Sequence, residues 1–249
     1  IAIGWQALSS NTTGAQNMAI GVRAMSNSTT ASYNFAVGHY AMQDLTTGTA
    51  NYAFGYQAAG NLTTGNRNVA IGKNALYNGT VTHDNVVIGE QAGYELSDGN
   101  AYYNIAIGSY ALDAGTTTAA NVAIGYGAAS QLQTGNGNTC IGTWAMLGAT
   151  GGANSNVVIG NTAGYDLTTG TNNTSLGHNA QPSSNSASNQ VTLGDSSVTD
   201  LRCNDTSISS LSDARDKTDV VDLPTGLNFL NTLRPVKFKW ATRDGNIKD

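Results

Sequence analysis

The segment Asn51-Tyr52-Ala53-Phe54-Gly55-Tyr56-Gln57-Ala58 decides the fold, because its pattern recurs along most of the chain. The consensus of the copies is asparagine, an apolar residue, alanine, isoleucine or valine, glycine, two variable residues and alanine. The repeat glycine recurs every 17 residues, apart from one spacing of 19 and one of 18, at Gly4, Gly21, Gly38, Gly55, Gly72, Gly89, Gly108, Gly125, Gly142, Gly160, Gly177 and Gly194. Such a fixed period indicates a repeat architecture.

Each copy contains one short strand signal. The stretch Asn68-Val69-Ala70-Ile71-Gly72 alternates large and small apolar residues and is too short for a helix of several turns. Clusters such as Thr46-Thr47-Gly48 and Thr63-Thr64-Gly65 supply a second turn within the unit. We therefore predict that each 17-residue unit is one coil of a β-solenoid, with two short strands and two turns.

Stacking of the coils restricts which side chains recur. A strand that bonds to its equivalent in the next coil, about 4.8 Å away, places every residue beside its own counterpart. We expect isoleucine and valine ladders to fill the interior, alanine and glycine to occupy tight corners, and each asparagine to bond to the asparagines above and below. About eleven coils would give a rod of roughly 50 Å.

The predicted fold class is all-β, a parallel β-solenoid or β-roll of about eleven 17-residue coils, followed by the start of an α+β module. One thin coil has little room for a core, and chains of this kind usually need oligomerisation to bury enough surface. We expect a parallel homotrimer. The alternative is a monomeric solenoid with a wider cross-section.

Composition narrows the function classes. Only 11% of the 249 residues are charged and the net charge is −5, which gives no electrostatic footprint for nucleic acid or an anionic membrane. No stretch approaches the run of about 20 apolar residues that spans a bilayer. Cys140 and Cys203 have no metal or redox spacing, so we expect free, buried thiols, no metal site and no cofactor.

Composition changes abruptly near residue 200, where basic residues become frequent. We expect the solenoid shaft over 1–180, a degenerate last coil and linker over 181–211, and a truncated start of a different domain over 212–249. In this last part, apolar residues at helical spacing predict a helix over 223–233, and alternation over 236–240 predicts a strand.

The C-terminal motifs carry a resemblance. Ser212-Asp213-Ala214-Arg215-Asp216-Lys217, an apolar helix, and then 233–240 (Leu-Arg-Pro-Val-Lys-Phe-Lys-Trp) resemble the start of the endosialidase-type intramolecular chaperone of phage tail fibres and tailspikes. The 17-residue repeats resemble the shafts of such fibres and the head repeats of bacterial trimeric autotransporter adhesins.

The resemblance implies a chaperone that trimerises the fibre, folds it and is then released by its own protease activity. By motif position, Ser212 would be the nucleophile, Lys217 the general base, and Leu211-Ser212 the cleaved bond. A lysine serves as a base when burial lowers its pKa towards neutrality. Autocleavage in a single turnover is the one reaction implied, and we expect no activity on an external substrate.

We therefore expect a structural and host-adhesion component of a phage tail fibre, located in the virion after assembly in the host cytoplasm. The expected partners are two further copies of the chain, other tail-fibre or baseplate proteins, and a host surface glycan or protein receptor. We expect no nucleic-acid partner and no membrane insertion. The alternatives are a tailspike depolymerase with paired carboxylates, and a bacterial trimeric surface adhesin ending in a membrane anchor.

The remaining chemically distinctive residues carry weaker signals. His39, His83 and His178 lack partners at metal-ligand spacing, and the scattered acidic residues are typical of solvated turns. Aromatic residues fall at variable repeat positions and should point outward, where they suit sugar or protein recognition or packing between chains. They are Trp5, Tyr40, Tyr56, Tyr77, Tyr94, Tyr110, Tyr126, Trp144 and Tyr165. The 19-residue coil around Tyr102-Tyr103 should form a bulge.

Overall fold

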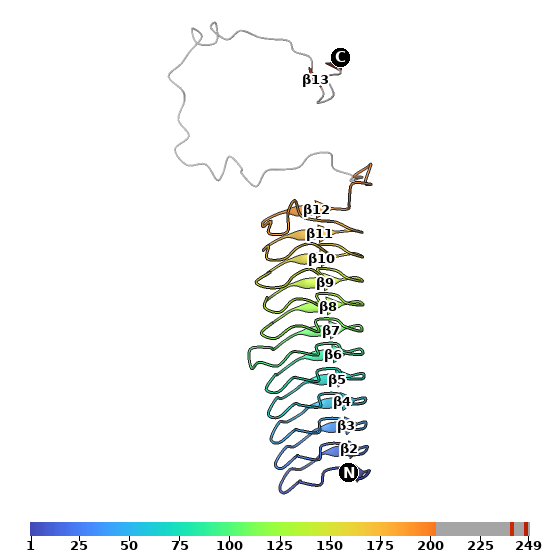
Figure 1. Ribbon diagram of the computed structural model, residues 1–249, viewed down its shortest axis with the longest axis vertical. Coiled ribbons are helices and arrows are strands. Elements are labelled where there is room, and N and C mark those ends of the chain that lie inside the picture. The colour runs from blue at the N-terminus through green and yellow to red at the C-terminus, as the bar shows by residue number, and fades with distance from the viewer. Residues whose placement is uncertain (203–239, 242–246, 249) are drawn as a thin grey trace, which may run out of the picture. The chain divides into compact units, whose positions relative to one another are not determined.

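The computed structural model describes residues 1–202, 240–241 and 247–248. The chain divides into two units, Ile1–Thr199 and Asp200–Asp249. The first unit is a stack of coils with one strand in each (Figure 1). In the second, β13 (Trp240–Ala241) pairs antiparallel with β14 (Ile247–Lys248). Ser212, Lys217, Cys203 and the helix expected over 223–233 lie outside the described residues.

The first unit holds a single parallel sheet of twelve strands in sequence order. The strands are β1 Ala2–Ile3, β2 Met18–Ile20, β3 Phe35–Val37, β4 Tyr52–Phe54, β5 Val69–Ile71, β6 Val86–Ile88, β7 Ile105–Ile107, β8 Val122–Ile124, β9 Thr139–Ile141, β10 Val157–Ile159, β11 Thr174–Leu176 and β12 Val191–Leu193. Each residue pairs with its own counterpart in the next coil, as Ala36 does with Ala53. This confirms the predicted all-β parallel solenoid of about eleven coils.

The second strand predicted for each coil is reduced to single bridges. Ser32 pairs with Thr49, and His83 pairs with both Asn66 and Tyr102, outside any strand. The reason is local: the Thr-Thr-Gly corner bends the chain, and the residue after each bridge has a positive φ, for example Arg67 at 56° and Asp84 at 59°. A left-handed residue ends an extended segment.

The interior is filled by small residues, and the expectation of isoleucine and valine ladders inside was wrong. In each of the strands β2 to β11 only the central residue is buried, which is Ala36 in β3 and Ala70 in β5. The two flanking residues of the strand point outward, because side chains alternate along a strand. The wall of the thin coil opposite the strand supplies the larger core residues, such as Met42 and Leu45.

The flanking strand residues therefore form a continuous apolar face along the unit, here called the strand face. Many of them are exposed, including Ile3, Tyr52, Phe54, Ile71, Ile105, Val157, Ile159, Leu176, Val191 and Leu193. Contiguous apolar surface of this kind marks an interaction site on a soluble protein.

A buried asparagine in each coil makes the ladder that the sequence predicted. The backbone N–H of Asn51 and its Nδ2 donate to Oδ1 of Asn34 at 2.9 and 3.1 Å, and Nδ2 also donates to the carbonyl of Gly65 at 2.8 Å. Asn68 bonds to Asn51 in the same way. The pattern continues to Asn173, so that the buried amide groups are satisfied in every coil.

The repeat position requires glycine because successive coils approach each other closely there. Gly72 has a φ of +130°, and a Cβ at this position would lie 2.5 Å from the carbonyl oxygen of Gly89. Both the backbone conformation and the space exclude a side chain there. Successive coils therefore meet closely at this corner.

Where the central strand residue is larger than alanine, the residue that faces it across the interior is smaller. β6 and β10 carry Val87 and Val158 in place of alanine, and in both coils the residue after the repeat alanine is glycine, Gly93 or Gly164. A Cβ on Gly93 would lie 3.2 Å from Val87 Cγ1, and one on Gly164 would lie 3.0 Å from Val158 Cγ1. The two positions face each other across the interior and share one volume.

This shared volume predicts a compensating pair of substitutions. Val87→Ala should lower the free energy of unfolding by about 2 kcal/mol through the cavity it leaves, and Gly93→Leu should destabilise by overpacking. The double variant should recover much of both losses, because it recreates the pairing of Ala106 with Leu112, whose φ of 53° matches the 54° of Gly93. Urea unfolding of all four proteins measures this coupling, and simple additivity would contradict a shared volume.

Candidate functional site

Two residues precede each ladder asparagine, and we call them the corner pair. Some corner pairs consist of small residues, as in Thr49-Ala50 and Ala119-Ala120. Three consecutive coils instead carry large polar or aromatic pairs. These line a cleft of about 330 Å³, formed by Asn66, Arg67, His83, Asp84, Tyr102 and Tyr103.

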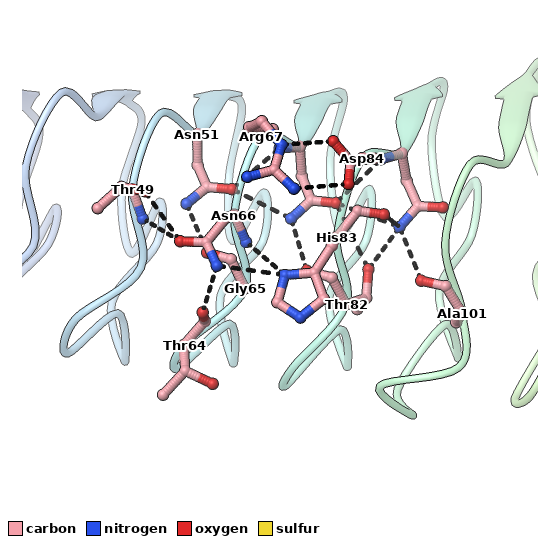
Figure 2. Close-up of polar contacts among 12 residues, drawn as sticks. Thr49, Asn51, Thr64, Gly65, Asn66, Arg67, Thr82, His83, Asp84 and Ala101 are labelled. Carbon is pink, nitrogen blue, oxygen red and sulfur yellow. Dashed lines mark hydrogen bonds and ion pairs between the residues drawn. The ribbon is translucent and has the colours of Figure 1, made fainter.

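Arg67 and Asp84 form a two-pronged ion pair between neighbouring coils (Figure 2). Arg67 Nε donates to Asp84 Oδ1 at 2.6 Å and Nη2 donates to Oδ2 at 2.8 Å. These hydrogen bonds lower the pKa of the Asp84 carboxyl below its usual value. The pair fixes a planar guanidinium and a charged carboxylate at the mouth of the cleft.

Asn66 and His83 form the second polar wall. Asn66 Oδ1 accepts bonds from the backbone N–H and the hydroxyl of Thr49 at 2.8 and 2.9 Å. The backbone N–H of Asn66 donates to His83 Nδ1 at 3.1 Å (Figure 2). Since Nδ1 accepts this bond, the proton of the neutral ring resides on Nε2, which then is a donor.

Tyr102 and Tyr103 close the cleft with two perpendicular rings. Their centroids lie 5.2 Å apart with an interplanar angle of 88°. Tyr103 is 62% exposed and has a φ of 57°, in line with the left-handed residues Arg67 and Asp84. The extra residues of the 19-residue coil lie immediately before this pair, and the coil between β6 and β7 extends beyond its neighbours (Figure 1).

Sequence reasoning treated these residues separately and did not find the cleft. In the sequence, His83 has no partner at metal-ligand spacing, Asp84 is one of the scattered acidic residues, and Tyr102-Tyr103 belong to the expected bulge. Aligning the repeats on the ladder asparagine brings Asn66-Arg67, His83-Asp84 and Tyr102-Tyr103 into consecutive rows. The 19-residue spacing obscured that alignment, because counting 17 residues from His83 misses Tyr102.

Many of the aromatic residues at variable positions lie on the surface, as predicted, whereas Tyr40, Tyr77, Tyr94 and Tyr110 are half-buried. Trp5, Tyr56, Tyr126, Trp144 and Tyr165 are exposed. Several form short ladders between coils: Tyr126 lies edge-on to both Tyr110 and Trp144, with centroids 5.8 and 6.1 Å away. Such contacts between coils also stabilise the stack.

A second group of interest is the Asp113 carboxyl, which lies next to Glu95. Burial, with a smaller contribution from the Glu95 charge, raises the pKa of Asp113 to about 6. Asp113 Oδ1 is buried without a hydrogen-bond partner. Neither residue lines the cleft between Asn66 and Tyr103.

Within the described residues there is no cluster of three or more histidine, cysteine, aspartate or glutamate side chains able to hold a metal ion. The same residues include no helix long and apolar enough to cross a membrane. Cys140 is a buried free thiol, and burial raises its pKa to about 12, as expected of an unreactive core cysteine.

Comparison with known families shows which family the C-terminal part resembles. Residues 212–249 match the chaperone of endosialidase family. The matched segment begins at Ser212 and includes Lys217, the two residues expected to carry autocleavage. No curated protein and no solved structure matches the chain. In sequence order, a segment similar to the chaperone of endosialidase family thus follows the long parallel β-solenoid.

The raised pKa of Asp113 predicts a pH-dependent stability. Between about pH 4 and pH 6 the folded protein retains a proton that the unfolded chain has lost, so stability should fall as pH rises through this range and stay lower above it. Asp113→Asn should flatten this dependence and raise the melting temperature at pH 8. Thermal unfolding from pH 4 to 8 measures it. Asp166→Asn, at an exposed site, is the control, and equal profiles for both variants would contradict the assignment.

Proposed function

We propose that the protein is a structural and host-adhesion component of a phage tail fibre, folded and trimerised by its C-terminal self-cleaving chaperone. One observation carries the proposal: an endosialidase-type chaperone directly follows a long, regular β-solenoid. A chaperone dedicated to one chain suits a stacked repeat fold, because an incomplete stack exposes an unpaired strand edge on which other chains can pair.

The strand face supports a homotrimer. Its outward isoleucine, valine and aromatic side chains run along the whole unit, whereas the coil interior holds mainly alanine with single leucine or methionine side chains. A second copy of the chain, in parallel orientation, offers the same face with the same spacing. Burying these faces against each other around a threefold axis supplies the core that one coil lacks.

A charge on the strand face should therefore block assembly. Ile71 is 38% exposed in the single chain, and Ile71→Lys should convert the trimer to monomer, because the ammonium group would be buried between subunits. Light scattering of the full-length protein measures the mass. Thr47→Lys, at an exposed turn residue, is the matched control and should leave the trimer intact. A monomeric wild type would refute the trimer.

Autocleavage is the second testable element. In this proposal Lys217 removes the hydroxyl proton of Ser212, whose Oγ attacks the Leu211 carbonyl, and the Leu211–Ser212 amide bond breaks as its nitrogen takes up the proton and leaves as the amine of Ser212. Water then hydrolyses the Leu211 ester, which releases Leu211 as a carboxylate and restores the Ser212 hydroxyl. Burial in the assembled trimer would give Lys217 the lowered pKa that a base requires. Release of the chaperone would then report that the fibre has folded.

Cleavage should depend on both side chains. Ser212→Ala and Lys217→Ala should each leave the full-length chain uncut, and mass spectrometry of the mature wild-type fibre should find Leu211 at its C-terminus. Ser209→Ala, just outside the motif, controls for substitution near the cut. Release of the C-terminal piece from both motif variants, seen on a denaturing gel, would refute the assignment.

A tailspike depolymerase is the alternative, and Asp113 next to Glu95 is the observation that favours it, since a carboxyl with raised pKa beside a second carboxylate is typical of glycosidases. Incubation of the fibre with host surface polysaccharide separates the functions. Adhesion gives binding without new reducing ends, whereas hydrolysis gives reducing ends that Asp113→Asn and Glu95→Gln abolish.

A further inference from the structure

The cleft between Asn66 and Tyr103 is not required by the solenoid. Thr49-Ala50 and Ala119-Ala120 occupy the same corner in other coils, and Ala50 and Ala120 have φ values of 58° and 56°, close to the 57° of Tyr103. The fold thus accepts alanine at this place. In the Arg67–Asp84 pair 61% of the arginine side chain and 21% of the aspartate side chain are accessible, and ion pairs at the surface contribute little to stability.

The walls of the cleft combine a flat apolar surface with fixed polar groups. The Tyr103 ring offers an exposed aromatic face. Asp84 offers carboxylate oxygens as acceptors, held in place by Arg67. His83 Nε2 offers a donor, since Nδ1 is occupied by the Asn66 backbone N–H. The volume of about 330 Å³ falls in the range of about 300 to 1,000 Å³ typical of small-ligand sites.

A pyranose ring matches this arrangement. One of its faces carries polarised C–H groups that pack on the electron-rich face of an aromatic ring, and its edge carries adjacent hydroxyls that both donate and accept. A carboxylate and a neutral imidazole N–H are partners for such hydroxyls. The positive charge of Arg67 is balanced by Asp84, so the cleft has no net charge with which to attract an anionic sugar.

We propose that the cleft formed by Asn66, Arg67, His83, Asp84, Tyr102 and Tyr103 binds a neutral pyranose of a host surface polysaccharide, with Tyr103 as the stacking platform and Asp84 as the hydroxyl acceptor. This assignment rests on the proposed adhesive function and locates it in three consecutive coils. The remainder of the shaft spaces and presents the site.

The experiment uses the full-length protein with defined saccharides as probes. Saturation-transfer NMR with maltotriose, chitotriose and lactose tests neutral sugars, and trigalacturonate and sialyllactose test acidic ones. At least one neutral probe should bind, and Tyr103→Ala should weaken its affinity by about tenfold or more. Asp84→Asn, which preserves shape but removes the carboxylate charge, should also weaken binding.

The matched control is Tyr33→Ala. Tyr33 is the second residue of another corner pair, with a φ of 63° and 59% exposure, and removing it should leave affinity for the sugar unchanged. Equal loss in both variants, unchanged binding in Tyr103→Ala, binding of acidic probes only, or binding of none would each overturn the inference. Light scattering on each variant confirms that the assembly is intact.

Cell binding distinguishes failure of the site from failure of the proposed function. If the wild type and Tyr103→Ala bind host cells equally well, adhesion stands and this cleft is not its site. If neither the wild-type fibre nor any variant binds cells or enters virions, the proposed function itself fails, whatever the sugar measurements show.

Discussion

The requirement that every residue stack on its own counterpart governs this structure. It acts most strongly at the buried asparagines. The side-chain amide of each asparagine donates to the asparagine of the preceding coil and to a corner carbonyl, and its side-chain oxygen accepts from the backbone N–H of the asparagine in the next coil. Asn51 does so through five bonds to Asn34, Gly65 and Asn68. Aspartate lacks the donor and serine is too short, so no other side chain completes the pattern.

The last described coil of the ladder shows the effect of replacing the ladder asparagine by another residue. Gln190 takes the place of asparagine, and its backbone N–H still donates to Asn173 Oδ1 at 3.1 Å. Its longer side chain, however, turns away and bonds to Ser183 through Oε1 and Nε2. The Gln190 side-chain oxygen therefore does not occupy the ladder position, and within the described residues the asparagine ladder ends at this coil.

The sequence predicted the coil, its period and the asparagine ladder, because each follows from a repeated residue type at fixed spacing. It did not predict which way the strand faces. Alternation of Val69, Ala70 and Ile71 is equally consistent with large residues inside or outside, and only the thinness of the coil decides in favour of alanine inside. The cleft escaped prediction for a different reason: it depends on corner pairs from three coils, one of which has an irregular length.

In the trimer proposed above, the outward strand face would link assembly to recognition. Tyr33, a corner residue, shares a cleft with Phe35 and Tyr52 of the strand face, so corner pairs border that face. If three chains join through their strand faces, the corners of Arg67, Asp84 and Tyr103 lie at the rim of the interface, open to solvent rather than at its centre.

Each such trimer would then present three equivalent clefts at one height. A shallow site binds one sugar weakly, but simultaneous engagement of several sites on a repeating polysaccharide can raise avidity by about 10² to 10⁴. A regular shaft that carries the cleft at its 19-residue coil is suited to that mode of binding, because the rigid coils hold the copies at fixed separation.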